Sequence, residues 1–421
     1  MRIGISAALL LALPLMAGCY DNDPLNAPDL SSSNGMMARY VSMGNSITAG
    51  YQSAGINDST QQQSYANLFA RAAQAPFFIP SLQGRGCAPP LVNNVTKVRV
   101  GGDTSSTTCD LRANQRLFYV SNVAVPGATS FSPTDNLSPF SNSNPLTTFI
   151  LGGRTQVQAM QDAQPTFVTA WIGNNDVLGA LTSSANPGNP ALVTPPAVFD
   201  SNYAHMLDSI EATGAKAALI GVADVTLIPY TSMGAVYWCL RTGLCPGVPA
   251  AAFPPNFGVN VNCAPKAAVP TSNGDSILVP WTVGVPKIAA AAQGAPAGIP
   301  QTTLDCATDP VVSPAEYANM HAAVVAYNGY IQSQAAARSM AYLDPNLTLG
   351  AAKLAGLIPL FPDLSGLPTL SPITFQGTGA PAATSLFSLD GVHPSALAHR
   401  LIADSLTATV NTFFGTSIPL P

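Results

Sequence analysis

Four short blocks of the sequence carry residue types that together could perform acyl transfer. One block holds a serine between glycines, two hold asparagine and glycine, and the last holds an aspartate three residues before a histidine. A serine nucleophile, donors for an oxyanion and an acid–base pair are the parts that this chemistry needs. The blocks are residues 44–50 (Gly-Asn-Ser-Ile-Thr-Ala-Gly), 122–127 (Asn-Val-Ala-Val-Pro-Gly), 173–176 (Gly-Asn-Asn-Asp) and 390–393 (Asp-Gly-Val-His).

Ser46 is the candidate nucleophile. It follows an apolar run typical of a β-strand, and Gly44 and Gly50 flank a tight passage from strand to helix. Such a passage can project a hydroxyl at the carboxyl end of a parallel sheet, where ligands bind in open α/β folds. The alternative is that Asn45 or Ser46 only caps the helix that follows.

Asp390 and His393 are the candidate acid–base pair. They are three residues apart and stand just before a predicted helix, so one short loop can present both side chains. His393 could take the proton from the serine while Asp390 orients the imidazole. The other histidines, at positions 205, 321 and 399, lie in predicted helices and have no aspartate at a comparable position.

The two remaining blocks offer donors for an oxyanion hole. Asn175 follows a predicted strand, so its amide can face the same sheet edge as Ser46. Gly127 follows another predicted strand and has no side chain to keep its N–H away from a ligand. The alternatives are a plain turn at Gly127 and a backbone-capping role for Asn175.

Apolar runs alternate with helical patterns along the chain, which predicts an α/β fold with a parallel sheet. At the start of one helix, Ser313, Pro314 and Glu316 predict an N-cap with a capping box. The predicted strands are residues 38–43, 118–123, 166–172, 216–222 and 340–343, and the predicted helices are residues 65–75, 199–213, 314–339 and 394–414.

Two stretches do not fit this alternation. Residues 93–116 follow no helical period, and residues 228–310 are rich in proline, glycine and alanine. A structureless loop of that length is unusual in a compact domain. We interpret residues 228–310 as an insertion pinned by disulfides that forms a lid or rim over the site; the alternative is a loop far from the chemistry.

The N-terminus is typical of an export signal. Residues 5–16 are apolar after Arg2 but too few to span a bilayer. The sequence Leu-Met-Ala-Gly-Cys ending at Cys19 resembles a bacterial lipobox. Residues 1–18 are therefore predicted to be a signal peptide, Cys19 a lipidated anchor and residues 19–36 a flexible tether. Tyr20 favours the outer membrane; an ordinary signal peptide is the alternative.

Six further cysteines form an even set, which suggests disulfides in an exported chain. Six cysteines allow fifteen pairings, and we predict that nearest neighbours pair. A zinc site is disfavoured because the chain has no Cys-x-x-Cys pair and no histidine near these cysteines. The predicted pairs are Cys87–Cys109, Cys239–Cys245 and Cys263–Cys306.

Composition limits the classes of partner. Charged residues make up 9% of the chain, well below the roughly 25% of an average soluble domain. The net charge is −5, so no basic surface is available for nucleic acid. The hydrophobic fraction of 47% is enough for a large core. The sequence does not set an oligomeric state.

The four blocks together resemble those of the SGNH/GDSL hydrolases (GDSL-like lipases and acylhydrolases), here as a lipoprotein member. The resemblance implies a flavodoxin-like three-layer α/β/α sandwich with a five-stranded parallel sheet, covering about residues 37–416. It implies no cofactor and no metal. Asn45 replaces the usual aspartate and Ala124 an earlier glycine, but neither is a triad position. The implied triad is Ser46, Asp390 and His393, and the implied oxyanion donors are Ser46, Gly127 and Asn175.

The expected function is therefore an exported, lipid-anchored serine ester hydrolase that acts on lipid or short-chain esters through an acyl-enzyme at Ser46. Low charge and a possible lid favour an apolar acyl group slightly. One alternative is a carbohydrate O-acetylesterase, in which Trp238 and Trp281 could stack on sugars. Another is a non-catalytic surface binding protein on a hydrolase fold, which Asn45 alone would favour.

Overall fold

The computed structural model describes residues 35–110, 112–113, 118–134, 146, 150–245, 253–294, 302–377 and 385–421. The predicted signal peptide (1–18), Cys19 and the tether up to residue 34 lie outside the described residues. Within the described ranges, no helix is both long enough and apolar enough to cross a membrane.

A parallel β-sheet forms the centre of the molecule. Its strands lie in the order β1 (Tyr40–Gly44), β2 (Phe167–Trp171), β3 (Lys216–Ile220) and β8 (Ala341–Leu343), and each pair of neighbours is parallel. Every residue of β1 and β2 is buried, as expected for a parallel sheet that is covered on both faces. The predicted α/β class is confirmed.

The predicted strand at residues 118–123 is reduced to one isolated bridge. Asn122 pairs with Ser42 in parallel, and the Val123 N–H donates to the Ser42 carbonyl at 2.9 Å. Phe118 at the start of this segment is fully exposed, so no packing extends the pairing in that direction. Within the described residues the sheet thus has four strands rather than five, with this segment beside β1.

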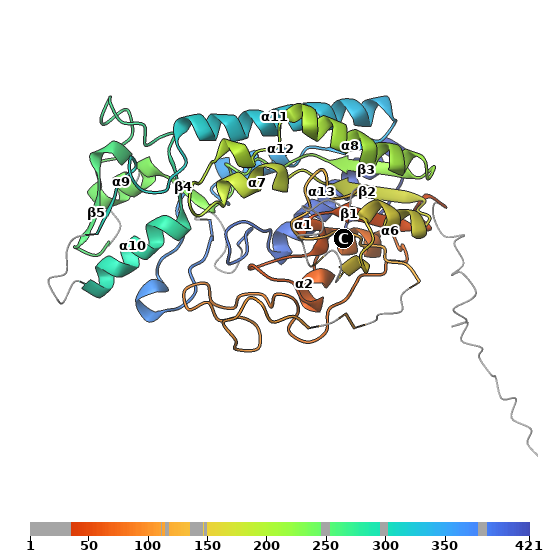
Figure 1. The fold of residues 1–421 in the computed structure, drawn as a ribbon, viewed down its shortest axis with the longest axis horizontal. Helices are drawn as coiled ribbons and strands as arrows, with labels where there is room; N and C mark the ends of the chain where they lie inside the picture. Colours follow the sequence, from red (N-terminus) through yellow and green to blue (C-terminus); the bar gives the residue numbers. More distant parts are fainter. Residues whose placement is uncertain are drawn as a thin grey trace, which may run out of the picture.

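Helices cover both faces of the sheet (Figure 1). Side chains alternate along a strand, so Val41 and Met43 pack into one layer while Tyr40 packs into the other. The first layer contains α6 (Gln156–Asp162), α7 (Asn175–Leu181), α8 (Pro196–Glu211) and α11 (Pro314–Ala337), and the second contains α3 (Tyr65–Ala72) and α13 (Ala396–Phe414). The three-layer α/β/α arrangement matches the expectation.

Helix starts follow local capping. Ser313 caps α11, and Glu316 completes the predicted capping box. The last helix begins at Ala396 rather than Pro394, with Ser395 as its N-cap, whose side chain accepts the Ala398 N–H at 3.3 Å. The remaining elements outside the insertion are η1 (Gly35–Met37), α1 (Ser46–Ala49), α2 (Asp58–Gln62), η2 (Pro190–Leu192), α12 (Pro345–Leu354) and η5 (Leu367–Thr369).

The insertion at residues 228–310 has regular structure of its own and lies to one side of the main sheet (Figure 1). β4 pairs antiparallel with β6, and β5 pairs parallel with β7. Tyr237, Phe257 and Ile288 belong to a separate small core, so the segment is not the structureless loop that its composition suggests. Its elements are β4 (Thr231–Met233), α9 (Gly234–Thr242), β5 (Phe257–Val259), η3 (Val261–Cys263), β6 (Leu278–Pro280), α10 (Trp281–Gly294) and β7 (Thr302–Leu304).

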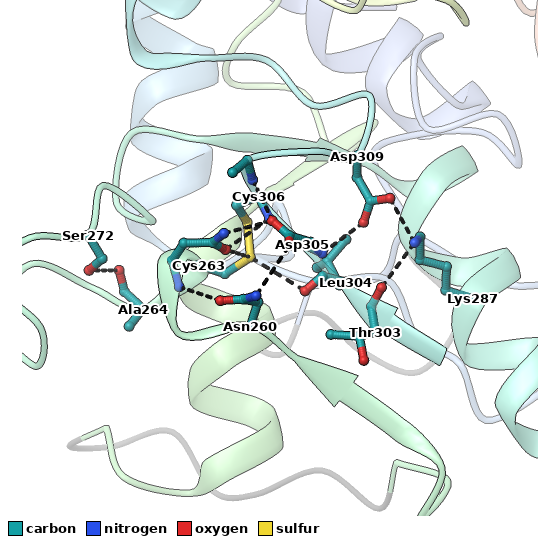
Figure 2. The surroundings of a disulfide bond; sticks show 12 residues. Asn260, Cys263, Ala264, Ser272, Lys287, Thr303, Leu304, Asp305, Cys306 and Asp309 are labelled. Carbon is teal, nitrogen blue, oxygen red and sulfur yellow. Dashed lines mark hydrogen bonds and ion pairs between the residues drawn. A yellow bond between two sulfur atoms is a disulfide. The ribbon is translucent and has the colours of Figure 1, made fainter. Parts of the chain in front are cut away.

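Three disulfides join the cysteines as nearest neighbours, as predicted: Cys87–Cys109, Cys239–Cys245 and Cys263–Cys306. Disulfides of this kind indicate an oxidising, extracytoplasmic environment. Figure 2 shows the third bridge, which joins η3 to the segment after β7. Nearby, the Cys306 N–H donates to the Asn262 side chain at 3.0 Å, and Lys287 of α10 forms an ion pair with Asp309 at 2.7 Å.

Loss of the third disulfide should destabilise the protein more than loss of the second. The sequence separation is 43 residues for Cys263–Cys306 and 6 for Cys239–Cys245; chain entropy then gives stabilisation of about 4 and about 2 kcal/mol. Cys263 is also fully buried in the insertion core. Urea unfolding of the two double-alanine variants tests this ranking, which an equal loss of stability would contradict.

Candidate active site

The predicted site blocks meet at the carboxyl edge of the sheet. Ser46 begins α1 two residues after the end of β1, and Asn175 begins α7 four residues after the end of β2. Parallel strands place these ends side by side. The Asn175 Nδ2 donates to the Ala128 carbonyl at 2.9 Å, so the asparagine block touches the residue that follows Gly127.

The turn before the serine is held by a buried glutamine. The Gly44 N–H donates to Gln156 Oε1, and Gln156 Nε2 donates to the Gly44 carbonyl, both at 2.9 Å. A Cβ atom on Gly44 would lie 2.1 Å from Thr48 Oγ1. The close approach of α1 therefore requires glycine at this position, and the amide of Gln156 fixes the backbone that leads into Ser46.

Asn45, which stands where the family has aspartate, caps α1. Its Oδ1 accepts the Ile47 N–H at 3.1 Å, the same bond that an aspartate would accept. Asn45 is fully buried, and its Nδ2 has no partner among the described residues. The substitution thus keeps the geometry of the turn and removes a buried negative charge beside Ser46.

A hydrogen-bonded chain links the serine, the histidine and the aspartate. Ser46 Oγ lies 2.9 Å from His393 Nε2, and His393 Nδ1 lies 2.8 Å from Asp390 Oδ2. Both ring nitrogens are engaged, so the imidazole has one orientation. The Tyr51 ring packs against it with centroids 4.9 Å apart. In this arrangement the histidine can accept the serine proton while the aspartate stabilises the resulting positive charge.

The Asp390 carboxylate is buried but well supplied with donors. Ala54 N–H donates at 2.7 Å, Val392 N–H and His393 N–H each at 2.9 Å, and the Ser388 hydroxyl at 3.1 Å. Burial alone would raise the pKa of Asp390, but the charge of His393 and these hydrogen bonds outweigh it and lower the pKa to about 2. Asp390 is therefore ionised at neutral pH.

A left-handed turn delivers one of these donors. Ser53 and Ala54 have φ values of 52° and 51°, a region that non-glycine residues rarely adopt. The Ser53 N–H donates to Ser388 Oγ at 2.8 Å, and the Leu389 N–H donates back to Ser53 Oγ at 3.2 Å. These reciprocal bonds hold the strained turn in place and aim the Ala54 N–H at the carboxylate.

The insertion reaches the site through Trp281. Its indole Nε1–H donates to the backbone carbonyl of Asp390 at 3.1 Å. Its ring lies against Phe375 and under the Lys97 ammonium, which is 5.3 Å from the ring centroid. Trp281 and Trp238 are only 8% and 9% exposed, so of the two interpretations, surface stacking on sugars or a place in the core, the core is the one observed. The insertion is not remote from the chemistry.

A small cavity of about 40 Å³ opens beside Ser46 and His393, and Asn174 is its only other polar lining residue. Asn174 Oδ1 accepts the Ala223 N–H at 2.9 Å, which fixes the amide orientation because a backbone N–H can only donate. Its Nδ2 is buried and has no partner among the described residues. The sequence does not single out Asn174, because two asparagines stand side by side after the predicted strand and only the second was predicted to be a donor.

The sequence of the first three blocks matches a known family. The model of the GDSL-like lipase/acylhydrolase family matches residues 40–263, which is more than half of the chain. The chain belongs to the GDSL-like lipase/acylhydrolase family. The match ends before Asp390 and His393, so their place in the site depends on the distances above.

Two solved structures resemble this GDSL-like protein. One is described as TesA, with 14% identity, a TM-score of 0.33, and coverage of 89% of this chain and 98% of that one. The other is an acetyl xylan esterase, AlAXEase, with 12% identity, a TM-score of 0.32, and coverage of 88% and 99%. Similarity at this level identifies no substrate. No curated protein matches the sequence.

A second aspartate–histidine pair supports the rim of the cavity. His321 Nδ1 lies 2.6 Å from Asp224 Oδ2, although 97 residues separate them in the sequence. Asp224 also accepts the Thr226 N–H and hydroxyl, and its own N–H donates to Asn346. The pair thereby ties α11 to the loop after β3. No local spacing in the sequence indicates this pair, because its two residues are far apart along the chain.

His399 lies behind the serine turn and is fully buried. The Tyr65 N–H donates to its Nδ1 at 3.3 Å, and the Tyr65 hydroxyl is 2.9 Å from Thr48 Oγ1 in α1. Burial and the charge of His393 lower the pKa of His399 from 6.5 to about 3. The imidazole is therefore neutral in the folded protein at pH values where it would be charged in the unfolded chain.

His399 should make a contribution to stability that rises with pH across its titration window, whereas Asp176, whose pKa burial raises to about 6, makes a contribution of opposite sign in part of that window. Between about pH 3 and 6.5 the unfolded chain binds the His399 proton and the folded protein does not, so this contribution is lost as pH falls, by at most about 1.4 kcal/mol per pH unit. The difference in unfolding free energy between the parent and His399→Gln, measured by urea unfolding, should grow with pH between about 3 and 6.5, because the contributions of Asp176 and Asp390 are the same in both proteins and cancel. The exposed His205, changed to glutamine, is the control; a difference for His399→Gln that does not change with pH would contradict the assignment.

Proposed function

We propose that this GDSL-like protein is a serine ester hydrolase that acts on carboxylic esters through an acyl-enzyme at Ser46. The unbroken hydrogen-bond chain from Ser46 through His393 to Asp390 carries the proposal. Ser46 Oγ attacks the ester carbonyl carbon while His393 takes its proton and then gives it to the leaving alcohol. Water, deprotonated by His393, then attacks the acyl-enzyme and releases the acid.

The oxyanion of each tetrahedral intermediate needs donors already in place. We propose the backbone N–H groups of Ser46 and Gly127 and the side chain of Asn175, whose bond to Ala128 uses one of its two N–H groups. Asn174 is a further candidate, because its free amide lies in the same cavity as Ser46.

The two alternative functions have less support. A non-catalytic binding protein would not need an ionised, fully hydrogen-bonded Asp390 behind an oriented histidine. The O-acetylesterase alternative depended on Trp238 and Trp281 as rings that stack on sugars, and both residues are buried. Neither has an observation of its own in its favour.

We also propose export and anchoring. Residues 1–18 would be removed as a signal peptide, Cys19 would carry a lipid, and residues 19–36 would tether the hydrolase domain (37–416) with its insertion (228–310) to the outer membrane of a bacterial envelope. The three disulfides support export. The sequence around Cys19 supports the anchor.

Replacing Ser46 with alanine should abolish ester hydrolysis. A form that begins at Asp21 should hydrolyse p-nitrophenyl esters, and its Ser46→Ala variant should lose about three orders of magnitude or more in kcat. A fluorophosphonate should label the parent protein and leave the variant unlabelled.

Replacing Asp390 with asparagine should keep Ser46 available for the label but lower kcat by about 10⁴-fold, because asparagine favours the wrong tautomer of the His393 imidazole. A folded parent that neither hydrolyses esters nor takes the label would contradict the proposal.

Replacing Asn174 with leucine should remove one donor at similar volume. If its amide contacts the reacting group, kcat should fall by about tenfold, the equivalent of one hydrogen bond of about 1.4 kcal/mol, with KM nearly unchanged. Asn175→Leu is the comparison for the donor implied by the family. An Asn174→Leu enzyme with full kcat would assign the oxyanion hole to the other donors alone.

A further inference from the structure

A second, larger cavity lies directly beside the one that contains Ser46. It has a volume of about 120 Å³ and lies between α12 and α13 at the carboxyl edge of the sheet. Four residues line both cavities: Ile47, Ala223, Ile228 and Val392. The space next to Ser46 and the larger space are thus neighbours that share these four apolar residues.

The larger cavity is chemically suited to hydrocarbon. None of the described residues that line it is charged, and its polar groups are the hydroxyls of Thr348 and Ser405 and the indole N–H of Trp171. The rest of the wall is aliphatic or aromatic, with Leu349 and Ala352 from α12 facing Ala398 and Ile402 from α13. A sugar bound here would leave most of its hydroxyls without partners, which is costly in a buried site.

The position of the cavity relative to Ser46 indicates which half of an ester would enter it. After the first chemical step the alcohol leaves and the acyl group stays bonded to Ser46. The alcohol and the incoming water both need access to solvent, whereas the acyl chain can remain enclosed until water releases it. An apolar space behind Ile47 and Val392 therefore fits the part of the substrate that stays.

We propose that this cavity is the acyl-chain site, so that the preferred substrate is an ester of a medium-chain fatty acid rather than an acetate. This inference rests on the proposed function. The chain would run from Ser46 past Ile47 and Val392 and end between α12 and α13. Each methylene buried there should raise kcat/KM by about fourfold, and the gain should stop once the chain fills the cavity.

The test compares p-nitrophenyl acetate, butanoate, octanoate and palmitate with the full chain and with Ala398→Phe, which fills the cavity from the α13 side without touching the Ser46 cavity. The parent should prefer octanoate to acetate by at least tenfold in kcat/KM. Ala398→Phe should lose that preference and keep its acetate rate within about twofold. The matched control is Leu397→Phe, on the same helix but outside the cavity, which should keep the preference.

The outcomes separate this inference from the function on which it rests. An active enzyme that prefers acetate, or an Ala398→Phe variant with an unchanged preference, would overturn the acyl site and leave the esterase standing. A folded parent with no hydrolysis and no fluorophosphonate label would overturn both. If Ala398→Phe loses acetate activity as well, the same comparison of octanoate with acetate is made with Ala352→Leu, which fills the cavity from the α12 side. That variant should lose the preference for octanoate and keep its acetate rate.

Discussion

The buried, ionised carboxylate of Asp390 is the constraint that organises the rest of the site. An isolated carboxylate in the interior costs several kcal/mol, so the fold must surround it with donors. They come from the strained turn at Ser53 and Ala54, from the loop of Asp390 itself and from the imidazole of His393. Because these segments are more than 300 residues apart in the sequence, the carboxylate is stable only when the whole domain has folded.

At the edge of the sheet, Ser46 lies between polar groups on one side and apolar side chains on the other. On one side lie the polar groups that hold and move the proton. On the other lie Ile47, Val392 and the uncharged wall of the larger cavity. The neutral His399 contacts Tyr65, and Tyr65 contacts Thr48 of α1, so α1 is supported without another charge near Ser46. Polar and apolar surfaces therefore meet at Ser46.

The sequence predicts those elements whose formation depends on neighbouring residues alone. The strands β1, β2 and β3 were visible as short apolar runs, and the cap at Ser313 was visible as a spacing of three residues. The same kind of run predicts a strand at residues 118–123, but the structure has only one bridge there, because Phe118 is exposed and adds no packing to the pairing. The proline-rich insertion concealed α9 and α10, whose stability comes from a core and disulfides that form only in three dimensions. Asn174 could not be separated from Asn175 without the Ala223 N–H that orients its amide.

The bond from Trp281 to the Asp390 carbonyl joins two parts that would otherwise be separable. A shortened protein made by excising the insertion would lose the indole that contacts the loop of Asp390, and it would expose Phe375 and leave a backbone carbonyl without its donor. The insertion thus stabilises the loop that contains Asp390. Grafting a lid from a relative onto this scaffold would have to supply an equivalent indole at the same place.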